Sequence, residues 1–137
     1  MVNNKNLSRF QGLPPENDQC DRKISGGPLY PTSDVVQALE AALPQLWTRK
    51  CIADVANLGL EQEDVAGLLR EALTQNNFRE SEWCQQSTDG PWAACDAYDL
   101  TRMEWNEHAH KELRCDYYLK FAIGLTGRLV LTISCHT

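Results

Sequence analysis

Four side chains in the sequence are of types that handle protons and phosphate groups: Arg79, Tyr118, Lys120 and His136. The unperturbed pKa of a histidine is about 6.5, so His136 is suited to act as an acid or a base near neutral pH. A guanidinium is shaped for bidentate contact with phosphate, and Lys120 adds a second cation. Tyr118 and Lys120 are two residues apart, which on a strand puts both side chains on one face. The sequence therefore predicts a phosphate site here, although each residue alone is also typical of an ordinary surface or core position.

A second group of potential ligands is His108, His110 and Cys115, with Glu104 or Cys95 to complete it. Such side chains bind zinc, usually four at a time. The spacing is weak evidence, because residues two apart on a helix do not face the same way. A solvated surface segment is the stronger interpretation, and we predict no metal and no cofactor.

The elements that must position these residues follow from the hydrophobic periodicity. Helical spacing predicts helices from Ser33 to Pro44 and over residues 48–57 and 62–73. Polar and turn residues predict short strands and loops from Phe78, with Arg79 on a loop. They predict a helical or irregular excursion over 99–115. Two strands are predicted at 117–124 and 129–135, joined by a hairpin loop. The predicted fold class is α+β, with N-terminal helices packed on a small C-terminal antiparallel β-sheet.

Length, composition and charge narrow the possibilities further. The chain of 137 residues fits one domain, which we place at 30–137, after a flexible or loop-rich segment at 1–29 rich in Pro, Gly and Asn. The net charge is −6, and residues 31–110 carry five basic and fourteen acidic groups, or −9, which repels nucleic acid. Without an apolar leader or span, we expect a cytoplasmic protein with no membrane partner and reduced cysteines.

Several short motifs occur in an order that resembles the MqsR family, toxins of bacterial type II toxin–antitoxin systems. No single motif is diagnostic, but the pieces together, in the right order and at nearly the right spacings over about residues 30–137, are a much stronger signal. The matching pieces are Tyr30 to Val36, Leu46 to Lys50, Ala53 to Leu60, Leu73-Thr74 with Phe78, Trp92 with Asp96-Ala97-Tyr98, Tyr118-Leu119-Lys120, and Ser134-Cys135-His136.

The resemblance implies a fold similar to the RelE and YoeB ribonucleases and a metal-free endoribonuclease that cleaves mRNA and stops growth. That reaction uses the 2′-hydroxyl of RNA as nucleophile, so it needs a proton acceptor, a proton donor and cations. The resemblance places Tyr118, Lys120, His136 and Arg79 in these catalytic roles. It also implies two partners, an mRNA substrate and a cognate antitoxin that is MqsA-like, zinc-containing and DNA-binding.

The sequence departs from the family at positions close to the expected chemistry. Glu80 stands where the family has a lysine, Cys95 where it has a glutamine, and the stretch 99–116 is longer than the family's loop. These departures and the acidic middle favour an alternative function, in which RNA cleavage is weakened or lost and the protein acts by binding a protein partner. The sequence leaves both functions open and favours the enzyme.

Overall fold

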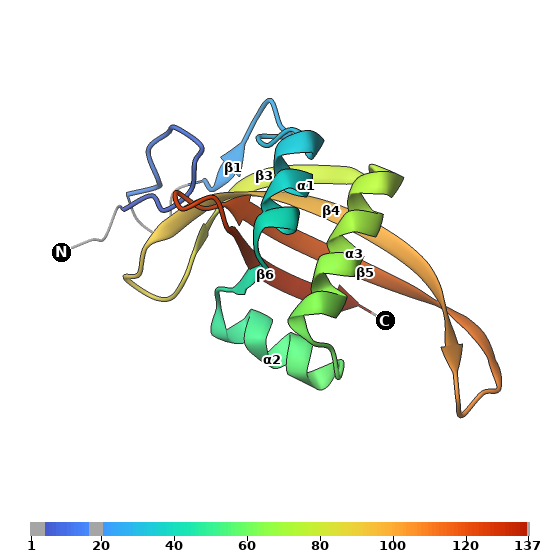
Figure 1. The fold of residues 1–137 in the computed structure, drawn as a ribbon. Helices are drawn as coiled ribbons and strands as arrows, with labels where there is room; N and C mark the ends of the chain where they lie inside the picture. Colours follow the sequence, from blue (N-terminus) through green and yellow to red (C-terminus); the bar gives the residue numbers. More distant parts are fainter. Residues whose placement is uncertain (1–4, 17–20, 137) are drawn as a thin grey trace.

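A six-stranded sheet is the main feature of the computed structural model, which describes residues 5–16 and 21–136 and side chains as far as Thr132 (Figure 1). The strand order is β1-β3-β4-β5-β6-β2, and only the β2–β6 pair is parallel. The strands are β1 (Lys23–Ile24), β2 (Gln45–Leu46), β3 (Phe78–Gln85), β4 (Trp92–Asn106), β5 (Lys111–Ile123) and β6 (Leu129–His136).

The helices lie across one face of this sheet (Figure 1). They are α1 (Thr32–Ala41), α2 (Arg49–Asn57) and α3 (Gln62–Gln75), which confirms the three predicted helices. Their ends follow ordinary capping chemistry. The Thr48 hydroxyl accepts a hydrogen bond from the Cys51 amide at 3.0 Å, and Glu61 with Asp64 forms a capping box at the start of α3. None of the helices in the described residues is long and apolar enough to cross a membrane.

The predicted fold class is wrong. The sheet is neither small nor confined to the C-terminal part; it is a curled half-barrel that dominates the molecule, and both of its edge strands, β1 and β2, come from the first third of the chain. Strands β1 and β2 come before and between the helices, and β3 to β6 follow them, so the architecture is mixed α/β with strands dominating. The predicted strands 117–124 and 129–135 are confirmed within β5 and β6.

The largest single error concerns residues 99–115, which we predicted to be helical or irregular. They are strand: β4 and β5 continue past the rest of the sheet as a two-stranded arm, defined here as residues 102–115 (Figure 1). The reason is that neither face of the arm is buried. Apolar residues do alternate with polar ones here, with Met103 and Trp105 on β4 and Leu113 and Cys115 on β5, but two such residues per strand are a weak signal among so many charged neighbours.

The main core lies between the helices and the face of the sheet that they cover. Tyr98 and Phe121 stack there with ring centroids 5.7 Å apart and an interplanar angle of 11°. Leu119 and Leu131 are fully buried on the same face, as the alternation along β5 and β6 requires. This packing fixes the opposite face of the strands, which carries the candidate site.

The described residues before Tyr30 also contact the sheet. The Leu7 amide donates to the Trp92 carbonyl, and the amides of Leu29 and Tyr30 donate to the buried Asp96 carboxylate at 2.9 and 3.0 Å. A buried carboxylate requires such donors, because an unpaired one carries a large desolvation cost. These bonds tie the segment to the centre of the sheet, while the domain boundary at residue 30 stays a prediction.

Candidate active site

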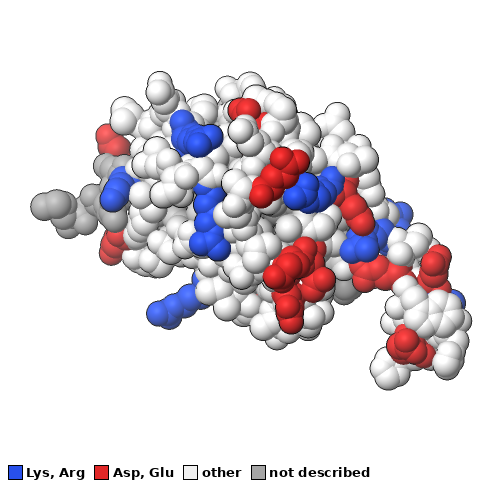
Figure 2. Space-filling view, in the orientation of Figure 1, with Lys and Arg blue, Asp and Glu red and all other residues white. Residues whose placement is uncertain are grey.

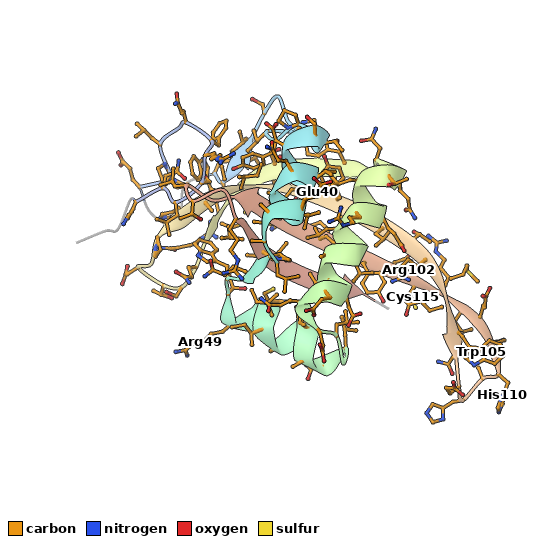
Figure 3. All side chains as sticks on the ribbon, in the orientation of Figure 1. Glu40, Arg49, Arg102, Trp105, His110 and Cys115 are labelled. Carbon is orange, nitrogen blue, oxygen red and sulfur yellow. The ribbon has the colours of Figure 1, made fainter. Side chains whose placement is uncertain are left out.

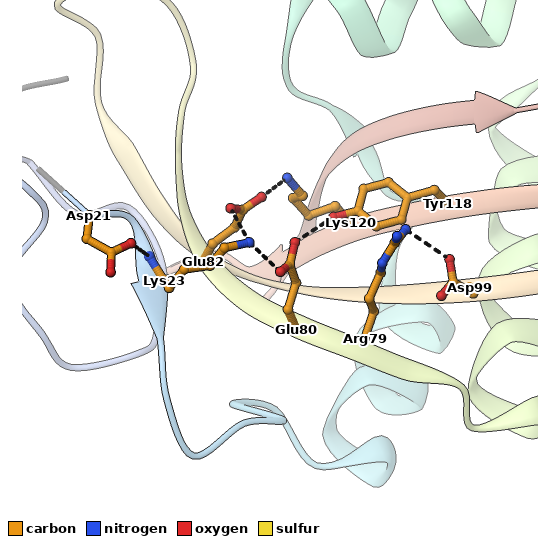
Figure 4. A network of polar contacts seen from close by, with 8 residues as sticks. All are labelled: Asp21, Lys23, Arg79, Glu80, Glu82, Asp99, Tyr118 and Lys120. Carbon is orange, nitrogen blue, oxygen red and sulfur yellow. Dashed lines mark hydrogen bonds and ion pairs between the residues drawn. The ribbon is translucent and has the colours of Figure 1, made fainter. Parts of the chain in front are cut away.

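The candidate site lies on the face of the sheet opposite α1 and α3, where strand register brings β3, β4 and β5 together. Lys120 on β5 is opposite Ala97 on β4, which in turn is opposite Glu80 on β3. Tyr118 is opposite Asp99 in the same way. Residues directly opposite one another in a sheet share a face. One surface therefore carries the side chains of Lys120, Glu80, Tyr118 and Asp99 (Figure 4).

This surface carries a chain of alternating charges. Lys120 contacts Glu82 through a short ion pair, and Lys23 of β1 lies between Glu82, at 3.5 Å, and Glu80, which it contacts closely. Glu82 and Lys120 are the best shielded pair, with side-chain exposures of 19% and 16%. Such partly buried pairs are screened less by salt than surface pairs. The network therefore holds the Lys120 ammonium in a fixed place on the sheet.

Tyr118 is at the centre of the cluster and has a cation on each side. The Arg79 guanidinium carbon lies 5.2 Å from the ring centroid, and the Lys120 ammonium lies 5.5 Å from it. Both distances are within the range of a cation–π interaction. The Tyr118 hydroxyl donates to Glu80 Oε1 at 3.4 Å (Figure 4). One tyrosine, two cations and one carboxylate thus meet within a single small surface.

The pKa values follow from these contacts. A hydrogen bond from Lys23 lowers the pKa of Glu80, so this carboxylate is an ionised acceptor at neutral pH. Burial alone would lower the pKa of Lys120, but Cys84 and Glu82 outweigh it and leave the pKa above its ordinary value. Burial raises the pKa of Tyr118, which keeps its hydroxyl a donor. The cluster is therefore an ionised base, a fixed cation and a neutral phenol.

A hollow adjoins the cluster on the side of α2. Its volume is about 530 Å³, and Lys120, Glu82 and Thr132 line its sheet side. Arg49 and Lys50, from the first turn of α2, line its other side, and Arg49 points away from the body (Figure 3). Among the described residues Arg49 makes no ion pair. The hollow thus adds positive charge and space for a chain of phosphates next to Tyr118.

The structure brings together three of the four predicted site residues. Tyr118, Lys120 and Arg79 meet in one cluster, although Arg79 is on strand β3 and not on a loop. Arg79 also faces Asp99 at 3.5 Å. His136 lies on β6, where its backbone is opposite Asp116, and its side chain lies outside the described residues. Its predicted role as acid or base stays a prediction.

The two positions that depart from the family differ in accessibility. Glu80 is in the cluster with an exposed side-chain fraction of 31%, whereas Cys95 is 1% exposed and its thiol donates to the Ala93 carbonyl at 3.7 Å. Burial and the neighbouring Cys84 thiol raise the pKa of Cys95 well above its ordinary value. Cys95 is thus a buried neutral thiol, whereas the Glu80 carboxylate lies at the surface of the cluster.

The zinc interpretation finds little support in the geometry. His108 and His110 lie in the turn at the end of the arm, whereas Cys115 lies at its base on β5 (Figure 3). In the described part of the chain, no group of three or more His, Cys, Asp and Glu side chains is arranged to hold a metal ion. None of the four cysteines whose side chains are described is in a disulfide, and Cys20 and Cys135 lie outside the described side chains.

Sequence reasoning missed two members of the charge network, one carboxylate and one cation. Glu82 and Lys23 complete the charge network, and neither was singled out. A signal for Glu82 was present, because Glu80 and Glu82 have the period of two that puts them on one face of a strand. Lys23 had no such signal, since its place depends on the pairing of the two-residue strand β1 with β3.

No protein-family model, curated protein or solved structure matches this chain.

Proposed function

We propose that the protein is a metal-free endoribonuclease that cleaves mRNA, the activity of an MqsR-like toxin. The observation that carries the proposal is the Tyr118 ring between two cations, 5.2 and 5.5 Å away, with its hydroxyl directed at a carboxylate. Two cations and a phenol donor suit a phosphodiester whose negative charge grows in the transition state. The adjoining hollow, with Arg49 and Lys50, suits the phosphates of neighbouring nucleotides.

In the proposed reaction, Glu80 takes the proton of the 2′-hydroxyl as the 2′-oxygen attacks the neighbouring phosphorus. The bond from phosphorus to the 5′-oxygen breaks, and the leaving oxygen takes a proton from an acid, the predicted role of His136. Lys120 stabilises the pentacoordinate phosphorane, because its ammonium has three donors and the contact with Glu82 uses only some of them. Arg79 and the Tyr118 hydroxyl contact the other phosphate oxygens. The products are a 2′,3′-cyclic phosphate and a 5′-hydroxyl.

This assignment gives Glu80 a role of its own at the position where the family has a lysine. A general base must be ionised at working pH and must lie close to the reacting group. Glu80 meets the first condition through its contact with Lys23, and the bond from Tyr118 directs it toward the cations that would hold the phosphate. The substitution of lysine by glutamate is then a change of mechanism and need not mean loss of activity.

The test is cleavage of a synthetic RNA by the purified protein in the presence of EDTA. We expect products ending in a cyclic phosphate and no cleavage when a 2′-deoxy nucleotide replaces the ribonucleotide at the cut site. Tyr118→Phe removes the hydroxyl and keeps the ring, so it should slow cleavage without unfolding the protein. Intact RNA after long incubation with folded wild-type protein would overturn the proposal.

A second candidate function is binding of a protein partner without catalysis. The partner would be a basic protein. One observation favours it: the three cations of the cluster each face a carboxylate, in the pairs Lys120–Glu82, Lys23–Glu80 and Arg79–Asp99. On the side of the molecule where the helices lie, Figure 2 shows further patches of Asp and Glu at the surface. Such a surface attracts a basic protein more than RNA. The assay above separates the two functions, because only the enzyme yields the cyclic phosphate.

A further inference from the structure

The arm has a strand edge without a partner in the described part of the chain. The pairing of β6 with β5 stops at Asp116, opposite His136, so the outer edge of β5 from Lys111 to Cys115 faces no described strand. The outer edge of β4 is closed at Thr101, just before the arm, where the Gln75 side chain of α3 donates to the Thr101 carbonyl at 2.7 Å and accepts from the Thr101 amide. From Arg102 to Asn106 that edge also faces no described strand. An open edge is a template for pairing with another strand.

We propose that this edge of β5 pairs with the same edge of a second copy of the chain, antiparallel and centred on Leu113. In a continuous sheet related by a two-fold axis, residues directly opposite each other lie on the same face. The pair centred on Leu113 puts Glu112 opposite Arg114 of the second copy, twice over. Both contacts join opposite charges, and the two leucines meet at the axis. This inference does not depend on the ribonuclease proposal.

The other symmetric registers are excluded by charge or by space. A centre at Glu112 puts two glutamates face to face, a centre at Arg114 two arginines, and a centre at Lys111 two lysines. Like charges directly opposite each other destabilise a strand pair. A centre at Cys115 requires the edge of Asp116, which β6 already occupies. The sequence of the edge is therefore self-complementary in one register only.

The arm alone also has reasons to gain from a partner. It is a two-stranded ribbon, which is marginally stable in water, and a pair of arms makes four strands. Trp105 lies opposite Glu112 and Met103 opposite Arg114, and each of these apolar side chains is 57% exposed. Trp105 lies near the end of the arm (Figure 3). Pairing of two arms places Trp105 and Met103 of both copies on one face of the four-stranded sheet. Because five residues on each copy form a small interface, the association is weak and depends on concentration.

The first test is sedimentation velocity of the whole protein over a range of concentrations. We expect the wild type to shift from monomer to dimer as the concentration rises. Arg114→Glu and Glu112→Arg should each abolish the shift, and the double variant Glu112→Arg/Arg114→Glu should restore it. Arg70→Glu, with the same change of charge on the exposed side of α3, should dimerise as the wild type does. A wild type that stays monomeric at all concentrations overturns the proposal, and so does a dimer that both single variants leave unchanged.

A cross-linking test checks the register and tolerates a weak equilibrium. Cα atoms of opposite residues in an antiparallel pair are about 4.5–5.5 Å apart, which a disulfide can bridge. Leu113→Cys, in a Cys115→Ser background, should oxidise to a covalent dimer as the concentration rises. Met103→Cys in the same background is equally exposed on the arm but distant from the axis, so it should cross-link several-fold less. Equal cross-linking by both variants contradicts the register centred on Leu113.

Discussion

Strands β4 and β5 each have two halves with different surroundings, although one unbroken register joins them from Asp96–Phe121 to Asn106–Lys111. In the body, the described side chains of β4 from Trp92 to Leu100 are buried except Asp99, which is intermediate. In the arm, no side chain of either strand is buried. The same ladder therefore serves as a rigid support at one end and as a free surface at the other. The candidate active site is on the support, and the candidate dimer contact is on the free surface.

The largest effect is expected from a core substitution in the body. Phe121→Ala removes a ring that is fully buried and stacked on Tyr98, so it should lower the free energy of unfolding by about 3–5 kcal/mol. Leu113→Ala, its matched control on the arm, should change stability by less than about 1 kcal/mol, because its side chain is half-exposed. Urea unfolding followed by circular dichroism measures both. Equal losses of unfolding free energy in the two variants would contradict the difference in burial between the body and the arm.

The next effect concerns the proposed base. Glu80→Gln keeps the size of the side chain but cannot accept a proton, so RNA cleavage should fall by about 100-fold or more. Glu112→Gln makes the same change on the arm and should leave cleavage unchanged. The readout is the initial rate of cyclic-phosphate formation with folded protein. If Glu80→Gln cleaves at the wild-type rate while the wild type is active, the base is another residue and the ribonuclease proposal still stands.

A smaller effect is expected from the cation on the same strand. Lys120→Ala removes the ammonium beside Tyr118 and should slow cleavage by about tenfold, or about 1.4 kcal/mol in the barrier. Lys111→Ala removes a lysine at the other end of β5 and serves as the control. Both variants should unfold at similar urea concentrations if the effect is chemical. Equal rates for Lys120→Ala and the wild type would exclude Lys120 from the site.

The smallest effect is a shift in the pH profile. The contact with Lys23 lowers the pKa of Glu80 below its ordinary value of 4.5, so the base stays ionised and the acidic limb of the profile lies below pH 4.5. Lys23→Ala removes the hydrogen bond, which raises the pKa of Glu80 and moves that limb to higher pH. The measurement is kcat/KM from acid to neutral pH. A limb that does not move would mean that a different group controls the reaction.

The sequence predicts the helices and the last two strands well because their apolar residues repeat with the right period. Val65, Leu68 and Leu69 of α3, for example, are all buried as the helical spacing requires. The arm and the two-residue strands β1 and β2 could not be predicted in this way. The arm has the period of two in Met103 and Trp105 and in Leu113 and Cys115, but too few apolar residues to outweigh its charged ones. Strands β1 and β2 exist only through pairing with β3 and β6, which are distant in sequence.

The site was predictable in part for the same reason. Tyr118 and Lys120 share a face because they are two apart on a strand, a local property that the sequence carries. Arg79 joins them only through the pairing of β3 with β4 and of β4 with β5, so spacing alone placed it on a loop. The carboxylates that pair with these cations also depend on register. Local spacing thus identified residues, and strand pairing decided which charges they meet.

The most direct test of the ribonuclease account is induced expression of the wild type beside Glu80→Gln, with growth recorded and total mRNA analysed by primer extension. The account predicts growth arrest and defined cleavage sites with the wild type, and neither with Glu80→Gln expressed at the same soluble level. Normal growth and intact mRNA with soluble, folded wild-type protein would contradict it and favour the protein-binding function.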